Sequence, residues 1–227
     1  MQVLSKRMIH EKNQMKTTTK LLLTLLPCTF LLACGDDVGE IDENGLLDGH
    51  DENPNEVMTT LKLTFTPTSG GESFVITWAD PELDGDPSID DITLNNGQSY
   101  AMTFEVLNEL EEPTKDVTPE IRDEMDEHQV FFTGSAVEGP SNTANPDAVM
   151  EHRYEDLDNY GIPIGLSNTM VAKAAGTGTL KVLLRHMPEV NGTPIKTDGL
   201  AAIMDTAGAT ALPGSTDINV DFNVTVE

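Results

Sequence analysis

Apolar and polar residues alternate with a period of two along most of the chain after residue 56. The clearest run is the last, DINVDFNVTVE, in which every second residue from Ile218 to Val226 is apolar. The same alternation occurs in residues 61–66, 74–79, 100–106 and 180–186. Successive side chains of a strand point to opposite faces, so this period predicts half-buried β-strands. Clusters of Gly, Pro, Asn and Asp separate the runs and are typical of turns.

Residues 118–127 interrupt the alternation. Thr118 is a favourable helix N-cap, Pro119 suits the first helical position, and acids in the first turn favour a helix. We therefore predict one short helix through about Glu127, with residues 191–215 as a long loop. Seven to nine strands without βαβ alternation predict an all-β fold, an antiparallel β-sandwich of Greek-key or immunoglobulin-like type.

The N-terminal part carries a different pattern. Lys16 and Lys20 precede the apolar run LLLTLLPCTFLLA, and a basic segment before a short apolar segment is typical of a secretory signal. The residues up to Cys34, LLAC, match the bacterial lipobox, in which the cysteine is acylated and becomes the mature N-terminus. We predict a lipoprotein signal peptide at residues 1–33 and lipidation, including palmitate-type acyl chains, at Cys34.

The segment after Cys34 predicts where the acyl chains anchor the protein. Asp36 and Asp37 follow the cysteine closely, and such an acidic cluster resembles the surface-export signal of Bacteroidota lipoproteins. Residues 34–55 are acidic, rich in Gly and Asn, and lack apolar periodicity, which predicts a disordered tether. We expect an outer-membrane lipoprotein, on the cell surface or the periplasmic face, whose remaining residues 56–227 form one domain.

The balance of acidic and basic residues limits the classes of function that the protein can have. The full chain has 39 acidic and 13 basic residues, of which one acid and five bases precede Cys34. Residues 34–227 therefore carry 38 acids against 8 bases, a net charge of −30. Such a surface repels nucleic acid and attracts cations, so we exclude nucleic-acid binding.

Two histidines and two glutamates form the candidate metal site. His128 begins one predicted strand and His186 ends another, so the two imidazoles meet if these strands are antiparallel neighbours. Glu124 and Glu127 precede His128 and bring carboxylates to the same rim. This set suits Zn²⁺, Cu²⁺ or Ni²⁺, with binding that weakens as pH falls through about 6.5 because imidazole binds metals only when neutral. The alternative is that both histidines only cap carbonyls or pair with local acids.

Two acidic loops resemble sites for hard cations. The segment DPELDGDPSIDD supplies carboxylates for a candidate calcium loop from Asp80, Asp84, Asp86, Asp90 and Asp91. The segment DLDNYGIPIGL has the spacing D-x-D-x-x-G, but its twelfth position is Ser167 where an EF-hand has Glu. We interpret this second segment as an Asp-rich hairpin turn.

Enzyme signatures are scarce in this sequence. It contains no G-x-S-x-G, H-E-x-x-H or P-loop motif, and both cysteines are used by the signal and the lipid. We therefore expect that the protein is not an enzyme.

Five segments carry a resemblance to a known family: VMTTLKLTFTP, WADPELDGDP, IRDEMDEHQVFF, YEDLDNYGIPIGL and GTLKVLLRHMPEV. In this order they resemble small Bacteroidota-type outer-membrane lipoproteins found beside TonB-dependent receptors. Some members of that family are labelled "type 1 periplasmic binding fold", which implies an α/β fold that the strand pattern here contradicts. The resemblance implies an accessory role near a nutrient receptor.

Two hypotheses follow for the function. The first is a lipid-anchored binding module that captures a metal ion or metal complex and passes it to a TonB-dependent receptor. The second is a structural or adhesive surface domain whose acids only keep it solvated, with Ca²⁺ stiffening one loop.

Overall fold

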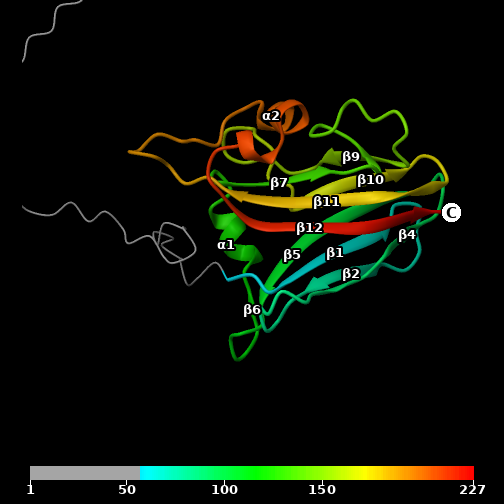
Figure 1. Ribbon diagram of the computed structural model, residues 1–227, viewed down its shortest axis with the longest axis horizontal. Helices are drawn as coiled ribbons and strands as arrows, with labels where there is room; N and C mark the ends of the chain where they lie inside the picture. The colour runs from blue at the N-terminus through cyan, green and yellow to red at the C-terminus, as the bar shows by residue number, and fades with distance from the viewer. Residues whose placement is uncertain (1–56) are drawn as a thin grey trace, which may run out of the picture. The chain divides into compact units, whose positions relative to one another are not determined.

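The computed structural model describes residues 57–227, which belong to one compact unit (Figure 1). The predicted signal peptide, the lipidation site at Cys34 and the tether lie outside the described residues. Twelve strands, two α-helices and one 3₁₀-helix make up the described part, so the fold is all-β as predicted. None of the helices in residues 57–227 has the length and apolar character needed to cross a membrane.

The larger sheet has eight strands. Seven of them follow one another in the order β3 (Ser88–Ile89), β2 (Phe74–Ala79), β1 (Thr60–Pro67), β5 (Ser99–Asn108), β10 (Ser167–Ala172), β9 (Met150–Tyr154) and β8 (Val137–Glu138). The eighth, β6 (Lys115–Asp116), pairs with the end of β5. All of these pairs are antiparallel except β8 with β9.

The smaller sheet has four strands. Their order is β4 (Ile92–Leu94), β12 (Ser215–Val226), β11 (Gly176–His186) and β7 (His128–Thr133). β12 is antiparallel to β11, which is antiparallel to β7, whereas β4 runs parallel to β12. β4 and β7 are therefore the two edge strands of this sheet.

Alternation along the strands explains the core. In β12 the five apolar residues from Ile218 to Val226 are buried, and the polar residues between them are exposed. One large hydrophobic cluster takes side chains from both sheets, including Leu63 and Phe104 of the larger sheet and Phe132 and Phe222 of the smaller one. The period-two runs therefore supply one common core.

The structure corrects three details of the sequence prediction. Pairing is not antiparallel throughout, because β12–β4 and β8–β9 are parallel. The described residues 57–227 form twelve strands rather than seven to nine, and the additional ones include strands of only two residues. The predicted loop 191–215 contains a second helix, α2 (Leu200–Ala207), followed by the 3₁₀-helix η1 (Ala209–Ala211).

The second helix forms because the apolar side chains on one side of it are buried against the smaller sheet. Leu200 and Met204, four residues apart, are the buried residues of α2. They pack with Phe131 of β7, with Leu183 of β11 and with Met187, the residue after β11. Together these side chains form a second, smaller hydrophobic cluster. α2 thus lies over the outer side of β7 and β11 (Figure 1).

The first helix, α1 (Thr118–Asp123), is shorter than predicted. Its N-cap is Val117, while the Thr118 hydroxyl lies 3.0 Å from the Val106 backbone nitrogen and accepts its hydrogen bond. The chain leaves the helix before Glu124, so residues 124–127 form a turn that leads directly into β7. This turn carries both glutamates of the candidate metal site.

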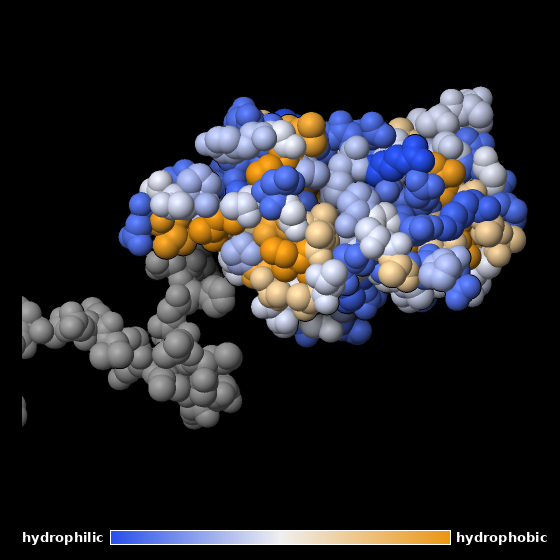
Figure 2. Space-filling view, turned by 90° about the horizontal axis from the view of Figure 1, so that it is seen from above, coloured by the Kyte–Doolittle hydropathy of each residue, from blue (hydrophilic) through white to orange (hydrophobic). Residues whose placement is uncertain are grey.

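The face of the molecule seen from above shows no single dominant apolar area. In Figure 2, apolar areas on this face are separated by polar residues. The large apolar residues exposed among residues 57–227 are distributed over several loops and strands, with Tyr160 and Leu157 the most exposed. Singly exposed apolar residues are normal on a soluble surface.

Candidate metal-binding site

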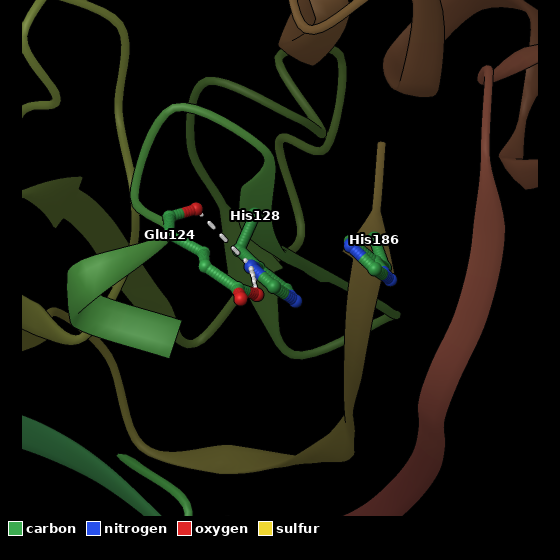
Figure 3. Close-up of side chains that lie close together, drawn as sticks. All are labelled: Glu124, His128 and His186. Atoms are coloured by element: carbon green, nitrogen blue, oxygen red, sulfur yellow. Dashed lines mark hydrogen bonds and ion pairs between the residues drawn. The ribbon is translucent and has the colours of Figure 1, made fainter. Parts of the chain in front are cut away.

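The pairing of β7 with β11 brings the two predicted histidines together. His128 lies directly opposite His186 in the antiparallel register, so the start of one strand meets the end of the other. Their rings are stacked, with centroids 4.4 Å apart and planes 4° from parallel (Figure 3). Both side chains project from rigid, hydrogen-bonded strands.

Glu124 is the carboxylate beside His128. The Nδ1 atom of His128 lies 3.2 Å from the backbone oxygen of Glu124 and 3.9 Å from its carboxylate Oε2 (Figure 3). Ligand atoms of Glu124, His128 and His186 all lie within 4.8 Å of one another. Among residues 57–227 this is the group of three His, Cys, Asp or Glu residues with metal-binding geometry.

Glu127 lies beside the other histidine. Its Oε2 atom is 3.6 Å from His186 Nε2, and its side chain is partly exposed. The structure therefore places three of the four sequence-predicted ligands in one group and the fourth next to His186. The two carboxylates lie in the turn 124–127 and not in the helix that was predicted to extend through about Glu127, because α1 ends at Asp123.

The side chains of the candidate site differ in how far they are exposed to solvent. His128 is 1% exposed, and the side chains of His186 and Glu124 are 15% and 51% exposed. An ion would therefore reach the histidines from the side of Glu124 and His186. Glu124 has room to change rotamer because half of its side chain faces solvent.

The donor set matches the chemistry of borderline metals. Zn²⁺ binds imidazole nitrogen at about 2.0–2.1 Å and carboxylate oxygen at about 2.0–2.2 Å, with four ligands in a tetrahedron. Ligand atoms spread over as much as 4.8 Å would have to draw together by an ångström or more around such an ion. That movement needs rotation of the imidazoles and of the exposed Glu124 side chain, without a change of strand register.

The candidate calcium loop has a different arrangement. Asp80 accepts hydrogen bonds from the backbone nitrogens of Asp84 and Gly85, at 3.1 and 3.0 Å. Asp84, Asp90 and Asp91 likewise accept from a backbone or side-chain nitrogen. Within residues 57–227 no three of these acids form a group with metal-binding geometry. Calcium binding here stays a prediction without a geometric observation in its favour.

The second acidic loop is the turn that the sequence predicted. Asp156 accepts backbone hydrogen bonds from Gly165 and Leu166, each at 2.9 Å, and Leu157 forms a bridge with Pro163. Asp158 accepts from the backbone nitrogen of Ile162 at 2.8 Å. The carboxylates thus hold the loop's own backbone.

His152 and Lys196 are two of the buried ionisable residues that sequence reasoning missed. His152 is 1% exposed, and its Nε2 atom lies 2.9 Å from the Asn168 side-chain oxygen. Lys196 is 2% exposed and lies against the turn that carries the two glutamates. The alternation in MEHRY places His152 inward with Met150, which was a usable signal. The loop around Lys196 has no periodicity that could have indicated its burial.

No protein-family model, curated protein or solved structure matches this chain. The resemblance to outer-membrane lipoproteins therefore stays a prediction.

Proposed function

We propose that the protein is a lipid-anchored outer-membrane module that binds a transition-metal ion, Zn²⁺ or Cu²⁺, through His128, His186 and Glu124, with Glu127 as a fourth candidate ligand. The observation that carries the proposal is the pairing of His128 with His186 on adjacent strands beside a carboxylate. Two imidazoles and one or two carboxylates are a usual ligand set for these ions.

The charge of the molecule supports the same function. A net charge of −30 over residues 34–227 raises the local concentration of cations and favours their approach to a partly open site. Acylation at Cys34 would keep the module at the outer membrane. The family resemblance implies an accessory role beside a TonB-dependent receptor. The captured metal ion or metal complex would be passed to that receptor.

We also propose a specific arrangement of the two sheets. A β-sandwich of Greek-key or immunoglobulin-like type is supported by the hydrophobic cluster that takes residues from both sheets. In such a sandwich the site lies at one end of the edge strand β7, where the turn 124–127 enters the sheet.

Isothermal titration of the metal-stripped protein with Zn²⁺ and Cu²⁺ tests the proposal. We expect micromolar or tighter binding by the wild type and loss of binding in His128→Ala and His186→Ala. Glu105→Gln is a matched control, because it removes one negative charge at a residue that pairs with Lys62 on the larger sheet. Binding that is absent in the wild type, or equal in all four proteins, would contradict the metal site and favour the structural alternative.

A further inference from the structure

Lys196 is buried in the segment between β11 and α2. Its side chain is inaccessible to solvent, and so is that of its partner Asp158, whose Oδ2 atom lies 2.8 Å from the Lys196 ammonium. The ammonium also donates a hydrogen bond of 2.7 Å to the backbone oxygen of Met125. Lysine is almost never fully buried unless it is paired. Burial lowers the pKa of Lys196, and the contact with Asp158 opposes this effect.

Met125 lies in the turn between the two candidate carboxylate ligands. The other backbone contacts of this turn also restrain it: the Glu127 nitrogen donates to the Glu124 oxygen at 2.9 Å, and the Met187 nitrogen donates to the Glu127 oxygen at 2.7 Å. The bond from Lys196 therefore fixes the middle of a segment whose two ends carry Glu124 and Glu127.

The loop around Asp158 binds the same turn a second time. Asp126 accepts hydrogen bonds from the Asn159 backbone nitrogen at 3.0 Å and from its side-chain nitrogen at 2.9 Å. Asp158 itself is held by the backbone nitrogens of Tyr160 and Ile162. Because Asp158 neutralises Lys196, the lysine can restrain the turn without adding an uncompensated positive charge next to the metal site.

We propose that Lys196, together with Asp158, is a positioning residue for the metal site. It holds the 124–127 turn so that both carboxylates stay beside the histidines before an ion arrives. This inference rests on the metal-binding function proposed above. Residues that orient ligands from outside the first coordination sphere commonly contribute about 10- to 100-fold in metal affinity.

The double variant Asp158→Asn with Lys196→Met tests this role. Removing both charges avoids leaving the Asp158 carboxylate buried without its partner, and asparagine keeps the oxygen that accepts from Tyr160 and Ile162. The hydrogen bond to Met125 is lost. The control is Glu138→Gln with Lys173→Met, which removes an ion pair that is not part of the metal site.

Two measurements on the full chain separate the outcomes. We expect the Zn²⁺ dissociation constant to rise about tenfold or more in the double variant and to stay unchanged in the control. In the metal-free protein, amide hydrogen exchange at Glu127 and Met187 should become faster in the double variant alone. Wild-type affinity in the double variant, while the wild type binds Zn²⁺, would overturn the positioning role and leave the proposed function standing. Absence of Zn²⁺ binding by the wild type would overturn the proposed function and, with it, this inference.

Discussion

His152 is a buried histidine whose ionisation is perturbed by its surroundings. It lies among aromatic rings, with ring centroids 4.5 Å from Phe132 and 4.6 Å from Tyr154. Burial lowers the pKa of His152 from 6.5 to about 4, and the hydrogen bond with Asn168 only partly opposes this. The imidazole is therefore neutral in the folded protein at pH values where it is already charged in the unfolded chain.

This perturbation predicts an acid-sensitive fold. Between pH 6.5 and about 4 the unfolded state binds a proton at residue 152 and the folded state does not, so stability falls as pH drops through this window. From pH 7 to pH 4.5 the loss from this group is about 2 to 3 kcal/mol. Urea unfolding of wild type and His152→Gln at both pH values measures it. The variant should lose less stability than the wild type, and equal losses would contradict the neutral buried state.

The proximity of the two histidines of the candidate site could be predicted because the sequence pattern shows where each lies relative to the end of its strand. His128 begins an apolar run and His186 ends one, and antiparallel pairing places such residues side by side. Lys196 could not be predicted in the same way. Its burial depends on Asp158, 38 positions earlier in the chain, and on a turn oxygen at Met125.

At the scale of elements, the register between β7 and β11 positions the candidate site. Gly134 follows β7 at a φ of +102° and lies so close to β11 that a Cβ atom would come within 2.3 Å of the Thr179 oxygen. This close approach needs glycine both for its backbone conformation and for its lack of a side chain.

Gly134→Ala should therefore destabilise the fold more than an alanine at another glycine with positive φ. Gly97, at +78°, is the matched control because a Cβ atom there meets nothing within 4 Å. Both variants acquire the strain of an L-residue at positive φ, of about 1 to 2 kcal/mol. Gly134→Ala adds overpacking against the β11 backbone, of about 1 to 3 kcal/mol. Equal midpoints in chemical denaturation would contradict the observed approach of residue 134 to β11.

Long strands were predictable as elements and short ones were not. β1, β5, β11 and β12 are each eight residues or longer and contain the alternating runs, so they could be recognised without any partner strand. β3, β6 and β8 have two residues each and exist because a neighbouring strand binds them. α2 was missed because its apolar side is only Leu200 and Met204, which need the outer surface of the smaller sheet.

At the scale of the molecule, alternation predicted the fold class but not the topology. Alternation with a period of two indicates which side of a strand is buried. It does not indicate whether the neighbouring strands run parallel or antiparallel to it. The chain passes from the larger sheet at β3 to the edge of the smaller sheet at β4 within a few residues, and β4 there runs parallel to β12. The predicted lipidation signal and tether lie outside residues 57–227, which the structure describes.

Lipid anchoring predicts a specific labelling result in a bacterial host that modifies lipoproteins. A palmitate analogue should label the wild-type protein, and Cys34→Ser should abolish the label because acyl chains are added at that thiol or at the amine it exposes. Cys28→Ser should keep the label, since Cys28 lies within the predicted signal. Equal labelling of wild type and Cys34→Ser would contradict the anchor.

The ring nitrogens of the histidines report directly on metal binding at the proposed site. Long-range ¹H–¹⁵N NMR spectra of the ¹⁵N-labelled protein, recorded without and with one equivalent of Zn²⁺, follow each imidazole separately. His152 is an internal control, because it is buried beside Asn168. We predict that one ring nitrogen of His128 and one of His186 change shift together on addition of Zn²⁺, while both nitrogens of His152 stay in place. Unchanged spectra for His128 and His186, or a change confined to another histidine, would contradict a metal site at these two residues.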